Sequence, residues 1–347
     1  MPQSIHTIIV GGGQSGLAVS YFLRQAGREH LILDKSPQPA DSWRSQRWDS
    51  FTLVTPNSAF RLPGAEYSDS DPHGYMGRAE IIQRFENYIE RYQLPLSLGI
   101  NVEAVRQANN NGKYLVQTSD GDFLAQNVVV ADGWFRGGKI PGFSQKIRSS
   151  TTQVHSDAYR NPQSLPPGAV LVVGSAQSGA QITEELYQAG RKVFLATGGS
   201  PRVPRRYRGQ DIFDWLYQAG FFNRPIEMFT NLSNRTFVAP QVTGKNGGHT
   251  LSLHTFYGDG VTLLGHARDY VDGHLILADD LMENIGKTDQ GEKFLLKLID
   301  EYIQKSGLDV PEEEIPVSSD AYLAEGISSL DLHQADINTI IWACGFK

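Results

Sequence analysis

The 347-residue sequence predicts an α/β fold containing two similar βαβ units. The segments IIVGGGQSGLAVSYFLRQAGREHLILDK and LVVGSAQSGAQITEELYQAGRKVFLATG repeat one another at an offset of 163 residues. Each segment reads as a β-branched strand, a glycine turn, an amphipathic helix that stops at a glycine, and a second strand. Strands that alternate with helices in this way indicate a parallel sheet, so we expect one such sheet for each copy.

The glycine spacing in each copy is typical of a Rossmann-like dinucleotide-binding turn. The first glycine allows the chain to reverse, the second lets the backbone approach a pyrophosphate, and the third lets the helix pack closely on the strand. The helix N-terminus then directs N–H groups at the anion. One such motif is weak evidence, but here the strand–turn–helix context occurs twice. The residues expected to hold the two pyrophosphates are Gly11, Gly13, Gln14, Ser15 and Gly16 in the first copy, and Gly174, Ala176, Gln177, Ser178 and Gly179 in the second.

The two copies differ where their second strands end. The first ends at Asp34, whose carboxylate can accept hydrogen bonds from both hydroxyls of an adenosine ribose. The second has Thr197 at the matching position, so no carboxylate would repel a 2′-phosphate there. Three basic residues of the segment SPRVPRRYRG follow it: Arg202, Arg205 and Arg206. We therefore expect FAD at the first site and NADPH, held by these arginines, at the second. The alternative is that the arginines form a solvated basic loop.

Composition narrows the class of protein. A formal net charge of -7 and a pI near 5.7 argue against broad binding to nucleic acid or anionic membranes. The single cysteine, Cys344, excludes an internal disulfide and a C-x-x-C dithiol centre. We find no signal peptide and no apolar run of about 20 residues, so a cytoplasmic location is expected. The histidines lack metal-site spacing, and no metal is expected.

The rest of the chain suggests an inserted second domain. We expect residues 1–160 to form the first part of a FAD-binding domain, 161–305 an NADPH-binding domain, and 306–347 a return to the first domain. An amphipathic helix is predicted over 78–92. Helices are also expected in RGQDIFDWLYQAGFF and EKFLLKLIDEYIQKSG, a β-meander in GVTLLGHARDYVDGHLILADDL, and buried strands in NVVVADG and DINTIIWACGFK.

Beyond the two turns, several segments in order resemble the single-component (class B) flavin-dependent monooxygenases, in a bacterial branch of flavoprotein oxidoreductases. These segments are SWRSQRWDS, RWDSFTLVTPNSAFRLPG, VHSDAY, RVPRRYRGQDIFDWL, GVTLLGHARDY and IIWACGF, and the resemblance covers nearly the whole chain. It implies that NADPH reduces FAD and that O2 forms a C4a-(hydro)peroxyflavin. That species would oxygenate a small soluble substrate at nitrogen or sulfur, or hydroxylate it.

The resemblance also implies roles for residues outside the two turns. Asn57 and, equally, Thr55 lie where a side chain could act at the flavin ring. Val102 is expected to pack on the adenine. The residues expected along the FAD are Lys35, Ser42, Trp43, Arg44 and Trp48. The alternatives are a packed, turn-forming insertion for the loop residues and ordinary strand core for Val102.

The sequence also departs from the family pattern. Tyr159 replaces the tryptophan of Baeyer–Villiger enzymes, which favours heteroatom oxygenation or hydroxylation over lactone formation. Asp132 brings a carboxylate to a turn that usually reads Ala-Thr-Gly. The sequence ends at Lys347, before the residues that cap the flavin in the family, so either it is truncated or the pocket is open. An open pocket favours a rival, an NADPH oxidase or reductase without oxygen transfer. A third interpretation is a catalytically silent flavin-binding protein. Homodimers are common in such families.

Overall fold

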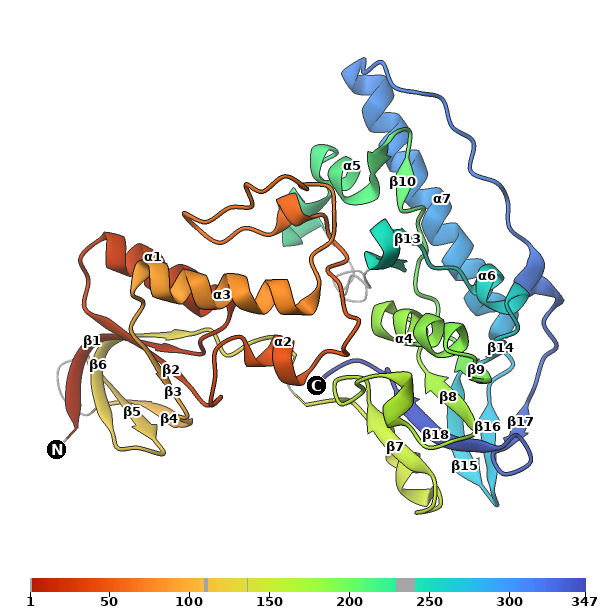
Figure 1. Cartoon of the computed structure of the whole chain (residues 1–347), viewed down its shortest axis with the longest axis horizontal. Coiled ribbons are helices and arrows are strands. Elements are labelled where there is room, and N and C mark those ends of the chain that lie inside the picture. The colour runs from red at the N-terminus through yellow and green to blue at the C-terminus, as the bar shows by residue number, and fades with distance from the viewer. Residues whose placement is uncertain (1, 109–111, 136, 229–240) are drawn as a thin grey trace. The chain divides into compact units, whose positions relative to one another are not determined.

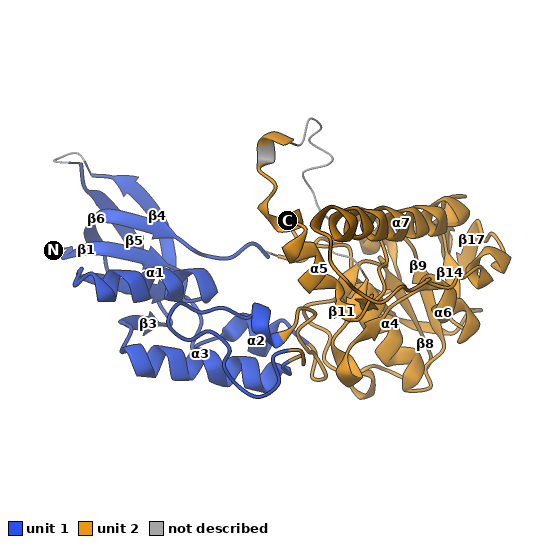
Figure 2. Cartoon of the chain, turned by 90° about the horizontal axis from the view of Figure 1, so that it is seen from above, with its two compact units in different colours: residues 1–47, 57–72, 76–136 blue, residues 48–56, 73–75, 137–347 orange. Residues whose placement is uncertain are grey.

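The computed structural model describes residues 2–108, 112–135, 137–228 and 241–347. The chain divides into two compact units (Figure 2). Unit 1 comprises residues 1–47, 57–72 and 76–136, and unit 2 comprises 48–56, 73–75 and 137–347. No helix in the described part of the chain is both long enough and apolar enough to cross a membrane.

Unit 1 contains a six-stranded sheet with the strand order β3-β2-β1-β6-β5-β4 (Figure 1). Its strands are β1 (Gln3–Val10), β2 (His30–Asp34), β3 (Leu96–Leu98), β4 (Val102–Gln107), β5 (Tyr114–Thr118) and β6 (Phe123–Val130). The first three strands and β6 are parallel, while β4, β5 and β6 form an antiparallel meander. The order β3-β2-β1 and the parallel pairing of these strands are those of a dinucleotide-binding fold.

Two helices of unit 1, α1 (Gln14–Gln25) and α3 (Arg78–Tyr92), lie side by side over this sheet (Figure 1). Helix α3 covers the predicted 78–92 range and buries Ile81, Phe85 and Tyr88 at helical spacing. The short helix α2 (Asp41–Ser45) follows β2. The predicted first βαβ unit is therefore present.

Unit 2 contains a five-stranded parallel sheet with the order β14-β9-β8-β18-β7. Its strands are β7 (Thr152–His155), β8 (Ala169–Val173), β9 (Val193–Ala196), β14 (Thr262–Leu264) and β18 (Ile337–Trp342). Its helices are α4 (Gln177–Gln188), α5 (Ile212–Gln218), α6 (Leu253–Gly258) and α7 (Leu281–Ser306). The predicted meander appears as β15 (Ala267–Val271) and β16 (His274–Leu277), joined by β17 (Ser329–Asp331). Two short hairpins pair β10 (Arg206–Tyr207) with β11 (Gln210–Asp211), and β12 (Val242–Thr243) with β13 (His249–Thr250).

The unit boundaries differ from the predicted division at 160 and 305. Strand β7 lies before residue 160 but pairs with β18 in the second sheet. Strand β18 was expected to return to the first domain, yet it lies between β8 and β7. The physical reason is burial: Ile340, Ile341 and Trp342 have no exposed surface and fill both faces of a central strand of unit 2.

Candidate dinucleotide-binding sites

The first glycine turn has a backbone that only glycine can adopt. Gly11 has φ of +106°, and a Cβ built on it would lie 2.4 Å from the carbonyl oxygen of Ala131. A Cβ on Gly16 would lie 1.9 Å from the carbonyl oxygen of Gly11. Gly13, by contrast, has nothing within 4 Å of a built Cβ and is exposed. Helix α1 begins after Gly13 without a side-chain cap, so its first N–H groups can bind an anion.

The second turn repeats this geometry. Gly174 also has φ of +106°, and its Cβ would lie 2.5 Å from the carbonyl oxygen of Ala343, the residue that follows β18. A Cβ on Gly179 would lie 1.8 Å from the carbonyl oxygen of Gly174. Helix α4 begins after Ala176, again without a side-chain cap. Strand β18 therefore closes the second turn as β6 closes the first.

Asp34 is fixed beside the first turn. Its Oδ2 accepts a hydrogen bond of 2.5 Å from the amide of Gly12, and its Oδ1 accepts one of 2.8 Å from the amide of Ser36. Each carboxylate oxygen has a second lone pair for another donor. The position and chemistry of Asp34 therefore fit the hydroxyls of an adenosine ribose.

The end of β9 carries no carboxylate. The hydroxyl of Thr197 is buried and donates to the carbonyl oxygen of Leu264 at 2.7 Å. Two glycines, Gly198 and Gly199, follow it, and Ser175 of the glycine turn hydrogen-bonds to the backbone of Gly198. The residues at the strand terminus itself therefore carry no charge at the ribose end of the second site.

A strap formed by residues 241–243 lies against the second turn. The side chain of Gln177 donates to the carbonyl oxygen of Val242, and the side chain of Gln241 donates to that of Ser175. The Oε1 atoms of both glutamines are buried without a partner among the described residues. Buried acceptors normally have a donor, and a pyridine nucleotide supplies ribose hydroxyl and carboxamide donors, so the site fits such a ligand. Gln241 could not be predicted as a site residue, because it lies in no motif and is far from the turn in the chain.

Two of the three predicted arginines are buried and paired with carboxylates of unit 2. Arg202 is 5 % exposed, and its Nη2 lies 2.8 Å from Glu292 and 3.3 Å from Asp289, both on α7. Its Nη1 donates to Ser252 at 3.1 Å. A buried guanidinium must be paired to offset its desolvation, and carboxylates of the same unit supply the pairing. The prediction that Arg202 holds a 2′-phosphate is therefore not supported by its position.

Arg205 is likewise engaged inside unit 2. It is 3 % exposed, and its Nη2 lies 2.5 Å from Asp211. Its Nη1 donates to the carbonyl oxygen of Val54 at 2.6 Å, and its guanidinium lies 4.4 Å from the centre of the Tyr75 ring. Burial, with the hydrogen bond to Asp211, raises the pKa of Tyr75 to about 12. Arg205 thus fastens segments 48–56 and 73–75 to the rest of unit 2.

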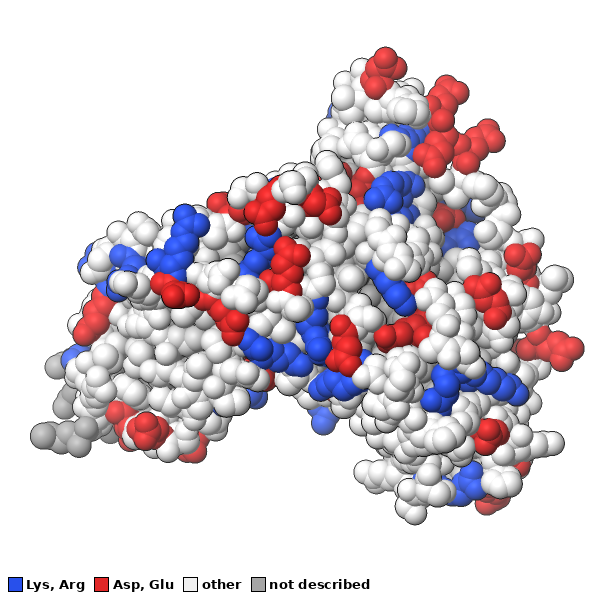
Figure 3. Space-filling view, in the orientation of Figure 1, with Lys and Arg blue, Asp and Glu red and all other residues white. Residues whose placement is uncertain are grey.

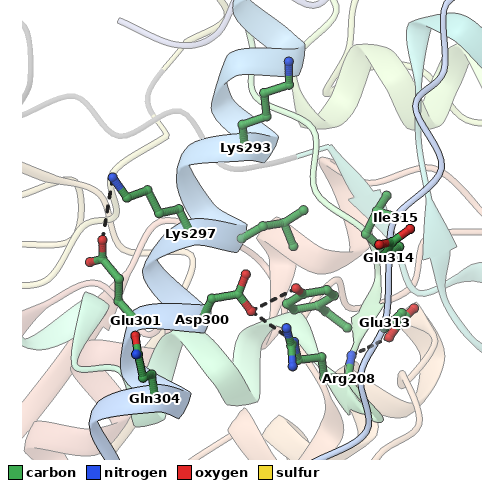
Figure 4. A pocket seen from close by; sticks show the side chains of 11 residues that line it. Arg208, Lys293, Lys297, Asp300, Glu301, Gln304, Glu313, Glu314 and Ile315 are labelled. Atoms are coloured by element: carbon green, nitrogen blue, oxygen red, sulfur yellow. Dashed lines mark hydrogen bonds and ion pairs between the residues drawn. The ribbon is translucent and has the colours of Figure 1, made fainter.

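The remaining arginines of the segment reach the surface at different places. Arg206 is exposed and donates to the carbonyl oxygen of Gly247 at 3.2 Å. Arg208 lies in a groove of about 620 Å³ beside α7, where its Nε is 3.0 Å from Asp300 (Figure 4). Both lysines and glutamates line that groove. Oppositely charged side chains are also interspersed over the face shown in Figure 3. The arginine run therefore does not form one anion site.

The loop residues expected along the FAD fall into both units. Ser42, Trp43 and Arg44 lie on α2 in unit 1, where Arg44 pairs with Glu86. Trp48, in contrast, is 4 % exposed and packs in the core of unit 2, with its ring 5.0 Å from that of Phe51. The expectation that Trp48 lies along the cofactor does not match this burial, which removes its apolar surface from water.

The two proposed catalytic residues belong to different units. Asn57, in unit 1, is 4 % exposed; its Nδ2 donates to the carbonyl oxygen of Asp71 at 2.9 Å, and its Oδ1 accepts from the amide of Met76 at 2.7 Å. Both polar atoms of the Asn57 side chain are hydrogen-bonded to the backbone and hold a loop in place. This geometry favours a structural role for Asn57. Thr55, in unit 2, is half-buried in a bend.

The other expected contacts lie in unit 1. Gln14 donates to the carbonyl oxygen of Arg61 at 3.4 Å, and Ser15 is exposed beside it. Lys35 is exposed after β2. Val102 begins β4, is half-buried and packs against the core of unit 1, and its predicted contact with adenine stays a prediction.

Tyr159, which replaces a family tryptophan, is a core residue. It is 1 % exposed, and its hydroxyl donates to Glu185 at 2.8 Å. Burial, followed by the adjacent Glu185 carboxylate, raises the pKa of Tyr159 well above its usual range. Neighbouring His155 hydrogen-bonds through Nε2 with the carbonyl oxygen of Gly345 at 3.0 Å. Both side chains therefore tie elements of unit 2 together.

Two dinucleotide-binding folds in one chain define a class of oxidoreductases. No group of His, Cys, Asp or Glu within the described ranges could hold a metal ion. The chain belongs to the pyridine nucleotide-disulphide oxidoreductase family, whose model matches residues 8–212. The family binds a flavin and a pyridine nucleotide, which confirms at family level the expectation of two such cofactors.

Comparison with known proteins places the chain among flavin monooxygenase relatives. It is 34% identical over 255 residues to an uncharacterized CzcO-like oxidoreductase of Geobacillus kaustophilus, covering 72% of this chain and 71% of the relative. It is 30% identical over 213 residues to the probable indole-3-pyruvate monooxygenase YUCCA1 of Arabidopsis thaliana, covering 59% of this chain and half (50%) of the relative. A flavin-containing monooxygenase from Stenotrophomonas maltophilia shares the fold, with a TM-score of 0.65 and 20% identity, over 99% of this chain and 79% of that one. The resemblance seen in the sequence is therefore confirmed.

Proposed function

We propose that this chain is an NADPH-dependent flavoprotein monooxygenase that oxygenates a small soluble molecule at nitrogen or sulfur, or hydroxylates it. The observation that carries the proposal is the duplication of one glycine turn with two different ribose ends. The first copy has a fixed carboxylate at Asp34, and the second has Thr197, whose hydroxyl is bound to Leu264, followed by Gly198 and Gly199. This difference supports FAD at the first turn and NADPH at the second.

The first turn would bind the pyrophosphate of FAD. The uncapped N–H groups of α1 and the exposed backbone at Gly13 provide donors and positive dipole for the anion. Asp34 would accept the ribose hydroxyls through its remaining lone pairs. When bound, the flavin would accept the hydride of NADPH and supply electrons for O2 activation.

The second turn would bind the coenzyme that supplies the hydride. The N–H groups at the start of α4, which have no side-chain cap, would bind its pyrophosphate. The unpartnered Oε1 atoms of Gln177 and Gln241 would accept hydrogen bonds from its hydroxyl or carboxamide groups, which would orient it and remove the cost of burying unpaired acceptors.

The names of relatives support the reaction type. The plant relative is called a probable indole-3-pyruvate monooxygenase, and a structure of the same fold is called a flavin-containing monooxygenase. The bacterial relative is named only an oxidoreductase. The substrate of this chain is accordingly proposed only as a small soft nucleophile, and a cytoplasmic location and a homodimer are proposed with it.

The test begins with the purified protein. Release of FAD on denaturation and anaerobic bleaching of the flavin by NADPH are expected. With O2 and a panel of amines and thioethers, at least one substrate should gain an oxygen atom from isotopically labelled O2. Peroxide equal to the NADPH consumed, with every substrate, would instead assign an NADPH oxidase. A colourless protein without NADPH turnover would assign a catalytically silent protein.

A further inference from the structure

The carboxyl end of β9 is where the adenosine half of a dinucleotide on the second turn must pass. Ser175 belongs to the turn, and its Oγ accepts a hydrogen bond of 2.9 Å from the amide of Gly198. The turn and the strand end are therefore adjacent. In dinucleotide-binding folds the residue at this strand end reads the ribose 2′ position. Here Gly198 and Gly199 have no side chains to do so.

Two basic side chains from elsewhere in unit 2 lie over these glycines. The Cδ of Lys287, on α7, is 2.7 Å from a Cβ built on Gly199. The Nε2 of His266, which follows β14, is 3.7 Å from a Cβ built on Gly198. The two residues are about half exposed, so both can reach a ligand from solvent.

Their present partners leave them able to bind an anion. Lys287 pairs with Glu283 one helical turn away at 2.6 Å, and both side chains are more than half exposed. Such a surface pair is weak and can be displaced by a dianion. His266 Nδ1 is 2.9 Å from Asp280, which orients the ring and leaves Nε2 toward Gly198. Burial acts to raise the pKa of Asp280, but hydrogen bonds from the His266 amide and ring lower it below its ordinary value. Asp280 therefore stays ionised beside the imidazole.

We infer that Lys287 and His266, and not the arginine run, recognise the 2′-phosphate of NADPH. This inference rests on the proposed function, because it needs a pyridine nucleotide on the second turn. Arg202 and Arg205 already form ion pairs with buried carboxylates. Lys287 would neutralise the phosphate, and His266, when protonated on both ring nitrogens, would donate to it from Nε2 while Nδ1 stays on Asp280.

The test measures binding rather than turnover. Calorimetric titration of the purified protein with 2′,5′-ADP and with 5′-AMP isolates the contribution of the 2′-phosphate. Wild type should bind 2′,5′-ADP more tightly. Lys287→Met should weaken 2′,5′-ADP about tenfold or more, the loss typical of a charge-assisted hydrogen bond, and leave 5′-AMP within about twofold. His266→Asn should act in the same direction.

Two controls make the test decisive. Lys297→Met removes a lysine of α7 that also has a glutamate partner four residues away, Glu301 at 3.7 Å, and should change neither affinity. Arg206→Gln removes the exposed arginine of the run and should also leave both unchanged. Loss of 2′,5′-ADP binding in Arg206→Gln but not in Lys287→Met would overturn the inference, as would equal binding of both nucleotides by wild type. Binding of neither nucleotide, nor of NADPH or NADH, would instead remove the proposed function itself.

Discussion

The side chain of Ser175 engages both backbone groups of Gly198: it accepts from the amide at 2.9 Å and donates to the carbonyl oxygen at 3.1 Å. In the first copy Gly12 occupies the position of Ser175, and the Asp34 carboxylate reaches back to its amide. In both copies a side chain joins the turn to the end of the second strand. In the first copy this side chain, Asp34, comes from the strand, and in the second copy it comes from the turn, at Ser175. One consequence is that a carboxylate stands at the first ribose end and none at the second.

Replacing the third glycine of each turn should separate the two sites. A methyl group at Gly16 or Gly179 would meet a carbonyl oxygen at 1.9 Å or 1.8 Å, so the helix must move. Each alanine variant should lose about 1–3 kcal/mol of stability, as in overpacked cores. Gly16→Ala should be purified with less flavin, whereas Gly179→Ala should retain flavin but bind NADPH weakly.

Flavin absorbance and NADPH titration measure these outcomes. Gly258→Ala, where a built Cβ meets nothing within 4 Å, is the control and should bind both cofactors normally. If Gly179→Ala lost flavin and kept NADPH, the assignment of the two turns would be reversed.

We expect Arg205 to stabilise the fold rather than to bind the coenzyme. Arg205→Met leaves Asp211 buried without its partner, and removing one member of a buried pair typically costs about 3–5 kcal/mol. Urea unfolding should show this loss. Arg208→Met breaks a more exposed pair with Asp300 and should cost less than about 1 kcal/mol. A stable Arg205→Met variant that prefers NADH would restore the arginine run as the phosphate site.

Asn57 should act on the loop it holds. Asn57→Ala removes two hydrogen bonds to backbone and leaves the Met76 amide unpaired, which should cost about 2–3 kcal/mol of stability. Asn87→Ala, on the exposed face of α3, is the control and should change stability by less than about 0.5 kcal/mol. An Asn57→Ala variant of normal stability that has lost oxygenation would make Asn57 catalytic after all.

The pair of His249 and Glu184 should make stability depend on pH. The carboxylate of Glu184, which accepts a hydrogen bond from Nε2 of His249 at 2.5 Å, raises the pKa of His249 above its ordinary value. A raised folded-state pKa stabilises the protein below the unfolded pKa of about 6.5, and the gain is lost as pH rises through the folded value. Between about pH 6 and about pH 9, wild type should therefore lose more unfolding free energy than His249→Gln. Parallel pH profiles of the two proteins would show that the pair contributes nothing.

Local patterns predicted the elements that are built from neighbouring residues. The two βαβ units and helix α3 follow from glycine spacing and apolar periodicity, which are encoded within short segments. The sequence predicts β18 as a buried strand but does not show which sheet it joins. Its neighbours β8 and β7 lie far away in the sequence, and the residues of a strand do not by themselves determine its pairing partners.

The partners of the charged residues were harder to predict, because they too lie far away in the sequence. The sequence of the arginine run suggests an exposed basic loop, yet Arg202 is paired with Glu292 and Asp289. Both carboxylates lie on α7, which begins only at Leu281. Lys287 arrives over Gly199 on that helix too. The sequence could therefore indicate that the second ribose end lacks a carboxylate, but not which basic residues surround it.

The late position of β18 in the chain has a consequence for synthesis on the ribosome. All six strands of the first sheet have been translated by residue 130, so that sheet can assemble early. In the second sheet, β8 and β7 flank a strand that emerges only at residues 337–342. A nascent chain paused before that point would carry two open strand edges, which are prone to mispairing and are the natural targets of chaperones.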